Sequence, residues 1–172
     1  ALEAWSAVNG AALKVLRDKE NSLNENNPSY LVIENNSDTA SGIANRGFLD
    51  GMSVKANTNY NFSVYAKALD GYTGNLYVRL CAGNETVGEG VIENITAEWT
   101  KYDLSFASSK TAFENVTLQV LADKGSIALD MISLFPEDTF KNRKNGMRKD
   151  LGKMLEELEP KFLRFPGGCI IE

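Results

Sequence analysis

Hydrophobic and polar residues alternate through most of residues 1–135, and this pattern constrains the fold more than any other feature of the chain. In residues 60–67 the even positions are Tyr, Phe, Val and Ala, and the odd positions are Asn, Ser, Tyr and Lys. Successive side chains of a strand point to opposite faces, so this run predicts a strand with one buried face. Similar alternation recurs in residues 76–81, 102–106, 116–121 and 127–131, and residues 13–16 and 30–33 are further predicted strands. In the run 127–131 we expect Ile127, Leu129 and Met131 to share the buried face.

Clusters of Asn, Gly, Asp and Ser separate these runs, as at residues 35–38, 56–59, 70–71 and 124–125. Such residues tolerate positive φ and form hydrogen bonds to their own backbone, so they favour turns. Short strands joined by turns, with no helix between them, are typical of an antiparallel sandwich. We therefore expect a mainly β domain over residues 1–136, an antiparallel β-sandwich of the jelly-roll type.

The pattern changes at Pro136, so residues 137–172 form a second predicted region. Leu151, Met154, Leu155 and Leu158 are spaced as one stripe of a helix, which we place at about 148–159, before Pro160. A predicted strand at about 162–165 then leads into Pro166-Gly167-Gly168. A helix, a strand and a glycine turn in this order are typical of a (β/α)8 barrel. Because this half-unit cannot bury itself, we expect the chain to be a fragment of a larger enzyme.

Charge and composition exclude several classes of function. The net charge of −5 gives no electrostatic reason to bind nucleic acid or an anionic membrane, and no apolar run reaches the length of a membrane span. The chain has no histidine, which excludes histidine-dependent nucleophilic and metal chemistry in this segment. We predict no cofactor and no metal site. Cys81 and Cys169 are expected to be free thiols.

Several aromatic residues allow two interpretations each. Tyr65, Tyr72 and Tyr77 could stack on sugar rings from an exposed sheet face, or they could form ordinary cross-strand pairs. Trp5 and Trp99 are interpreted as structural. Asp130 is a weak candidate for a structural calcium ligand, and the alternative is a hydrogen-bonded carboxylate.

Carboxylates in this chain give no sign of a catalytic pair. A glycosidase needs two of them on either side of the scissile bond, yet Glu156, Glu157 and Glu159 read as a solvated helix face. Arg164, at the end of the predicted strand, could hold a carboxylate through its planar guanidinium or could be a structural arginine. Glu172 follows the glycine turn, and its role is left open.

Residues 129–151 and 160–172 together resemble an α-L-arabinofuranosidase of glycoside hydrolase family 51. Residues 1–135 resemble the family 4/9-type carbohydrate-binding modules that interrupt the barrel in one branch of that family, through residues 2–5, 98–102 and 129–134. The resemblance implies that the sandwich is inserted after the first barrel strand, and that residues 162–165 form the second.

The resemblance also assigns roles within the predicted site. Arg164 corresponds to the arginine that supports the nucleophilic carboxylate, and Pro166, Gly167 and Gly168 line the arabinose subsite. Cys169 is a further candidate substrate-binding residue, because it stands where many members carry a sugar-contacting Asn, although the resemblance does not carry the contact of that Asn over to a cysteine. The catalytic glutamate pair is expected downstream, so this chain by itself should be inactive.

Three functional interpretations follow. In the first, the parent is an exo-acting retaining α-L-arabinofuranosidase that acts on arabinose-containing plant polysaccharides or oligosaccharides. In the second, the sandwich is a working carbohydrate-binding module. In the third, it is a structural insert without a ligand. A homo-oligomer is possible, and the compartment (secreted, periplasmic or cytoplasmic) is left open.

Overall fold

The computed structural model describes residues 2–47, 49 and 51–162. The chain divides into two compact units, Ala1–Phe135 and Pro136–Glu172.

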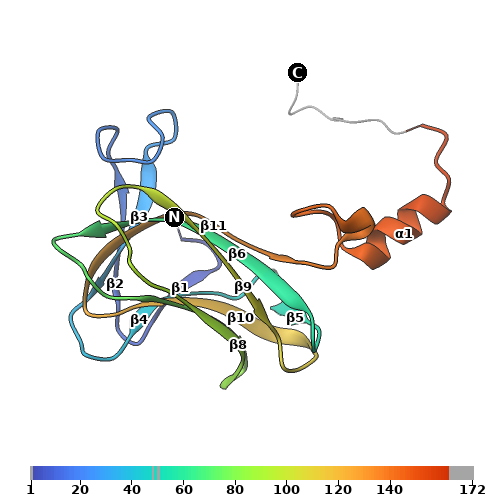
Figure 1. Cartoon of the computed structure of the whole chain (residues 1–172), viewed down its shortest axis with the longest axis horizontal. Helices are drawn as coiled ribbons and strands as arrows, with labels where there is room; N and C mark the ends of the chain where they lie inside the picture. The colour runs from blue at the N-terminus through green and yellow to red at the C-terminus, as the bar shows by residue number, and fades with distance from the viewer. Residues whose placement is uncertain (1, 48, 50, 163–172) are drawn as a thin grey trace. The chain divides into compact units, whose positions relative to one another are not determined.

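The first unit is a sandwich of two sheets (Figure 1). Sheet A contains, in spatial order, β1 (Trp5–Val8), β4 (Ser41–Asn45), β10 (Ala112–Ala122), β7 (Leu76–Ala82) and β8 (Glu85–Ile92), and β5 (Met52–Val54) also pairs with β10. Sheet B contains β2 (Ala12–Arg17), β3 (Ser29–Asn35), β11 (Gly125–Pro136), β6 (Asn59–Leu69) and β9 (Thr100–Ala107). Within each sheet the strand pairs β1–β4, β4–β10, β10–β7, β7–β8, β2–β3, β3–β11 and β6–β9 are antiparallel. The expected antiparallel sandwich is confirmed.

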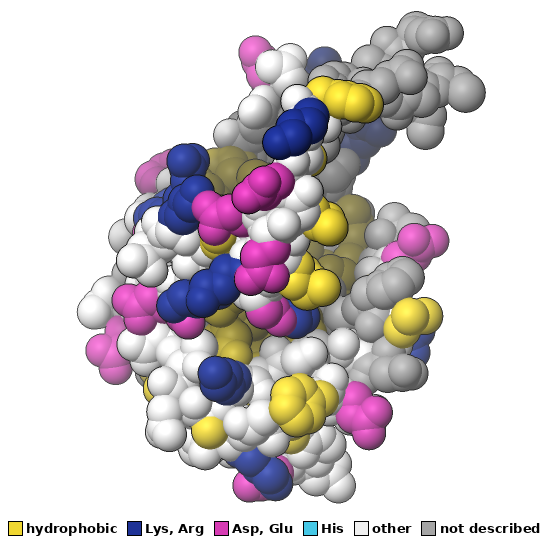
Figure 2. Space-filling model, turned by 90° about the vertical axis from the view of Figure 1, so that its right-hand side faces the viewer, with side chains coloured by type: hydrophobic (Ala, Val, Ile, Leu, Met, Phe, Trp, Pro, Cys, Tyr) yellow, Lys and Arg dark blue, Asp and Glu magenta, His cyan; other side chains and the backbone are white. Residues whose placement is uncertain are grey.

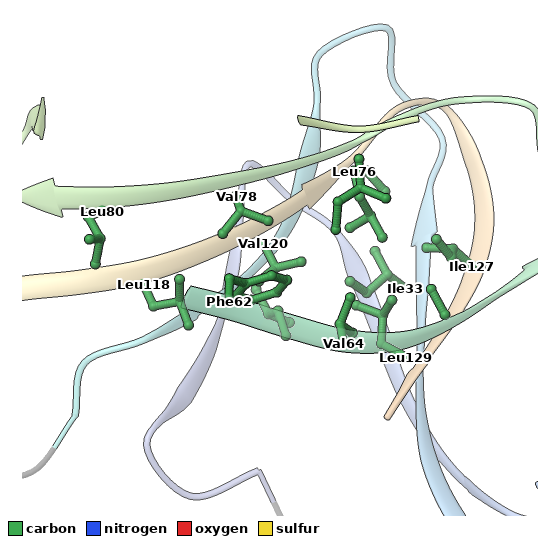
Figure 3. Close-up of a cluster of buried hydrophobic side chains, with 14 of the residues drawn as sticks. Ile33, Phe62, Val64, Leu76, Val78, Leu80, Leu118, Val120, Ile127 and Leu129 are labelled. Carbon is green, nitrogen blue, oxygen red and sulfur yellow. The ribbon is translucent and has the colours of Figure 1, made fainter. Parts of the chain in front are cut away.

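The core lies between the inner faces of the two sheets. Phe62 and Val64 of β6 are fully buried, as the alternation predicts, and Figure 3 shows Phe62 beside Val120 of β10. The largest buried side chains come from both sheets: Phe62, Ile33, Ile43, Leu76, Leu80, Ile127, Leu129, Val64, Val78 and Val116. Each strand is therefore held mainly by burial against the opposite sheet.

At one edge of the sandwich, two glycines of β8 let the sheets approach each other. Gly88 pairs with Leu80 and Gly90 pairs with Val78, so both occupy inward positions. A Cβ atom at Gly88 would lie 2.8 Å from the carbonyl oxygen of Ala107 in β9, and one at Gly90 would lie 2.8 Å from a methyl carbon of Leu104. The alternation rule did not find β8, because inward positions filled by glycine carry no hydrophobic signal.

The two glycines should differ in their tolerance of alanine. Gly88→Ala should lower the free energy of unfolding by about 1–3 kcal/mol, because the added methyl meets backbone that cannot move aside. Gly90→Ala should cost clearly less, since the leucine side chain that it meets can change rotamer. Urea unfolding of both variants measures the difference. Equal costs at the two positions would contradict this explanation of the closed edge.

The expected alternation of β11 is wrong at Met131. Ile127 and Leu129 are buried as expected, but Met131 is 62% exposed and has a φ of 51°. Left-handed backbone at this position shifts the phase of the strand by one residue, as a bulge does. After the shift Ile132 and Leu134 are the residues that pack against the core.

The second unit contains the expected helix. α1 spans Lys149–Glu157 and is preceded by a 3-10 turn, η1 (Phe140–Asn142). The phenyl ring of Phe140 packs on Gly152, where it leaves no room for a Cβ atom, and Lys149 pairs with Asp138 at 2.7 Å. The predicted stripe faces outward: Met147, Leu151, Met154, Leu155 and Leu158 are between 45% and 72% exposed. Of the predicted strand 162–165, residues 163–165 lie outside the described residues.

Candidate functional site

The predicted arabinose subsite falls outside the described part of the chain. Arg164, Pro166, Gly167, Gly168 and Cys169 belong to residues 163–172, and so does Glu172. Their assignment rests on the sequence resemblance.

The three candidate sugar-stacking tyrosines do not form one platform. Tyr65 lies on the outer face of β6 in sheet B, alternating with core residues Val64 and Ala66, and it is half-buried. Tyr77 lies on the outer face of β7 in sheet A, alternating with Leu76 and Val78, and it is also half-buried. These two rings are therefore on opposite sides of the sandwich.

The expectation that Tyr72 lies on an exposed face is wrong. Tyr72 is only 6% exposed and belongs to the core. It follows the Asp70-Gly71 turn, and its ring packs against Gly74 and Gly125, which have no side chain in the way. Its hydroxyl donates to the carbonyl oxygen of Asn75 at 2.7 Å and accepts from the backbone N–H of Asp123 at 3.0 Å. Burial raises the pKa of Tyr72 above its usual value. Its role is to tie the β6–β7 loop to the turn between β10 and β11.

Tyr72→Phe should therefore lower stability without touching any sugar-binding surface. Removing the hydroxyl deletes two hydrogen bonds of the loop. The bonds that remain between Asn75 and Asp123 are the 3.3 Å bond from the Asp123 N–H to the Asn75 carbonyl and the 2.9 Å bond from the Asn75 N–H to the Asp123 carboxylate, so the loss should be about 0.5–1.5 kcal/mol. Thermal and urea unfolding provide the measurement. Tyr77→Phe is the matched control, because its half-buried hydroxyl makes a single 3.3 Å contact with Asp123. A larger loss in the control than in Tyr72→Phe would overturn the assignment.

The outer face of sheet A around Tyr77 carries the chemistry that a sugar requires. The guanidinium of Arg79 lies over the Tyr77 ring at 5.9 Å, and its Nε is 3.3 Å from Glu89 of β8. Gln119 of β10 is the cross-strand partner of Arg79. An aromatic ring beside planar hydrogen-bonding groups can stack on the apolar face of a sugar and bind its hydroxyls.

The sequence pattern carried part of this information. Arg79 and Gln119 stand at outward positions of runs that were predicted as strands, so they could have been grouped with Tyr77. Glu89 could not, because β8 itself was not predicted.

Cys81, in the same strand as Arg79, is a buried free thiol, as expected. Figure 2 shows basic and acidic side chains interspersed over one face of the molecule rather than a patch of one sign.

The outer face of sheet B is partly covered. Tyr30, Val32 and Ala128 form a small second hydrophobic cluster there. Trp99 packs on this cluster with its ring 5.5 Å from that of Tyr30, and its indole N–H donates to the carbonyl oxygen of Asn21 at 2.8 Å. Trp99 thus holds part of the loop between β2 and β3, and Trp5 packs against the main core. Both tryptophans have structural roles.

Asp130 lies beside the bulge of β11. Its carboxylate accepts the backbone N–H of Met131 at 2.7 Å, and burial raises its pKa above the ordinary 3.8. Among residues 2–47, 49 and 51–162, no group of three or more His, Cys, Asp or Glu is placed to hold a metal ion. Asp130 is a hydrogen-bonded carboxylate here.

Asp130→Asn should raise stability at neutral pH, because an amide oxygen still accepts the Met131 N–H and no charge is buried. The raised pKa means that the folded chain holds this proton more tightly than the unfolded chain does. Wild-type stability should therefore fall as pH rises above 3.8 through the folded-state pKa, and the variant should lose this slope. Melting temperatures from pH 3 to 8 supply the measurement. A calcium role would give the opposite result, with lower stability in the variant and in wild type after chelation.

Within the described residues, no helix has both the length and the hydrophobicity needed to cross a membrane.

Comparison with known proteins gives a consistent set of relatives, although no family model matches the chain. An extracellular exo-α-L-arabinofuranosidase of Streptomyces chartreusis is 36% identical over 149 residues, which cover 87% of this chain and 17% of that protein. α-L-Arabinofuranosidase A of Aspergillus niger is 31% identical over 183 residues, covering 99% of this chain and 28% of that protein. This chain thus spans between 17% and 28% of the length of these two curated relatives.

Solved structures add a match that includes both units. An arabinose-bound family GH51 α-L-arabinofuranosidase has a TM-score of 0.87 and 29% identity, covering 97% of this chain and 28% of that one. A family 4 carbohydrate-binding module is 16% identical with a TM-score of 0.57, covering 78% of this chain and 96% of that one. A Stig cyclase from Fischerella is 14% identical with a TM-score of 0.58, covering 78% of this chain and 85% of that one. At these low identities, both show a shared sandwich fold alone. The fold by itself therefore does not assign a function. The resemblance of this chain to the α-L-arabinofuranosidases of glycoside hydrolase family 51 is confirmed for the segment of those proteins that it spans.

Proposed function

We propose that this chain is the inserted sandwich and the first part of the catalytic (β/α)8 barrel of an exo-acting, retaining α-L-arabinofuranosidase. One observation carries the proposal: a similarity at 31% identity to an arabinofuranosidase that covers 99% of the chain, across the boundary between its two units. A sandwich shared by convergence would not extend the match into residues 136–172.

The exposed stripe of α1 supports the barrel part of this proposal. The stripe consists of five exposed hydrophobic residues: Met147, Leu151, Met154, Leu155 and Leu158. In a (β/α)8 barrel, an amphipathic helix packs a stripe of this kind against the ring of strands that it surrounds. The remaining strands would come from the large part of the relatives' length that this chain does not span, since it covers 17% of one and 28% of the other.

Catalysis would be divided between this chain and the rest of the enzyme. Retaining glycosidases place two carboxyl groups about 5–5.5 Å apart and form a covalent glycosyl-enzyme intermediate. Glu85, Glu89 and Asp103 of this chain are exposed, and each is paired with a lysine or an arginine. The glutamate pair would therefore lie downstream. Arg164 would orient the nucleophile, and residues 166–168 would line the arabinose subsite.

Arg164→Ala in the complete enzyme should lower kcat far more than it lowers the melting temperature. A guanidinium beside the nucleophile keeps that carboxylate ionised and fixes its orientation. Its loss should cost about 2–4 kcal/mol of transition-state stabilisation, roughly 30- to 1000-fold in rate. Arg164→Lys should rescue poorly, because it keeps the charge but not the planar fork. Near-normal kcat with a lowered melting temperature would show a purely structural arginine.

The activity of the chain itself is a separate test. The purified 172-residue chain should not hydrolyse an aryl α-L-arabinofuranoside, while the complete enzyme should. Turnover by the chain that disappears on mutating one of its own carboxylates would refute the division of the site.

The second candidate function is carbohydrate binding by the sandwich, which the grouping of Tyr77, Arg79 and Gln119 on the outer face of sheet A favours. Deleting residues 1–135 from the complete enzyme would then lower activity on arabinan but not on a small arabinofuranoside. Loss on both substrates would instead favour a structural insert. Tyr77→Ala in the complete enzyme is the finer test, with Tyr65→Ala on the opposite sheet as the matched control.

A further inference from the structure

β2 is a free edge strand with hydrophobic side chains on both of its faces. It pairs with β3 on one side and ends the order of sheet B. Val15, which alternates with Arg17 and with the core-packed Leu13, is 49% exposed, and Leu16, on the other face, is 39% exposed. A strand of this kind presents unpaired backbone N–H and C=O groups together with apolar surface.

The other sheet edges are protected in ways that β2 is not. β1, at the corresponding edge of sheet A, has only four residues. β8 and β9 lie against each other at the closed edge, where Gly88 and Gly90 allow close approach. β2 has six residues, and its Lys14 is paired with Glu34 of β3 at 2.6 Å, so that lysine guards the edge less well than a free one would.

We propose that β2 pairs with β2 of a second copy of this chain, antiparallel and about a two-fold axis at Val15. This interface is independent of the proposed enzymatic function. In an antiparallel pair, directly opposed residues lie on the same face of the sheet. Only registers that oppose two odd-numbered or two even-numbered residues of β2 are therefore allowed. With the axis at Val15, Val15 opposes its own copy, Leu16 opposes Lys14 of the copy, and Leu13 opposes Arg17 of the copy.

Charge disfavours one neighbouring register, and the length of β2 disfavours the other, because an axis at Leu16 would pair only residues 15–17 of the strand with the second copy. Moving the axis to Lys14 would oppose two lysines directly, which is unfavourable. With the axis at Val15, no two like charges are directly opposed within residues 13–17. The aliphatic stems of Lys14 and Arg17 would instead cover the apolar side chains of the partner strand. The edge is therefore self-complementary, as a two-fold interface requires.

Sedimentation equilibrium of the 172-residue chain tests the pairing, in a concentration series that runs to about 1 mM because a single strand pair is a weak contact. The mass should rise toward that of a dimer. Val15→Lys should weaken dimerisation at least about tenfold, the effect of about 1.4 kcal/mol. Val91→Lys is the matched control, since Val91 is also an edge-strand valine and is 43% exposed; it should leave dimerisation unchanged. A monomer throughout the series, or equal effects of the two variants, would overturn the proposal.

A cross-linking experiment tests the register. In a Cys169→Ser background, Val15→Cys should form an intermolecular disulfide on mild oxidation, because opposed residues of antiparallel strands have Cα atoms about 4.5–5.5 Å apart. Val91→Cys should not do so at the same rate. Dimers that form without cross-linking at Val15 would show that a different surface associates, which would also overturn the proposal.

Discussion

Burial of the two inner sheet faces against each other is the interaction on which the rest of this structure depends. Strands as short as β1 or β4 have no stability of their own, and the hydrogen bonds between strands largely replace bonds to water. The side chains of Phe62, Ile33, Ile43 and Leu76 are removed from water only when both sheets are present. Three local features allow the two sheets to pack tightly on this layer of side chains. They are the glycines of β8, the hydrogen bonds of Tyr72 and the left-handed backbone at Met131.

The alternation of hydrophobic residues predicted the strands whose inward positions carry large side chains, such as β6, β7 and β10. It did not predict β8, where the inward positions are glycines, or β4, whose Ser41-Gly42-Ile43-Ala44 sequence offers one large residue. It also placed Met131 inside, because the change of phase comes from backbone dihedral angles and leaves no mark in a hydrophobicity pattern. Tyr72 was misjudged for a related reason, since a residue after a turn has no strand neighbours to fix its direction.

The candidate sites differ in the kind of evidence that assigns them. Arg164 and the Pro166-Gly167-Gly168 turn were assigned by resemblance, and their family is supported by matches that cover 97% and 99% of the chain. The sugar-stacking tyrosines were assigned by exposure, which depends on tertiary structure: Tyr72 is buried, while Tyr65 and Tyr77 lie on opposite faces. The polar surroundings of Tyr77 could be recognised only after the cross-strand partners of β7 were known.

Residues 1–135 form a sandwich with its own hydrophobic core, whereas α1 exposes an apolar face that the proposed enzyme would cover with strands outside this chain. Amide hydrogen exchange on a dilute monomer of the 172-residue chain tests this difference most directly. We expect strong protection in β6, β7 and β10 and weak protection throughout Lys149–Glu157. Protection of α1 equal to that of the central strands would contradict it.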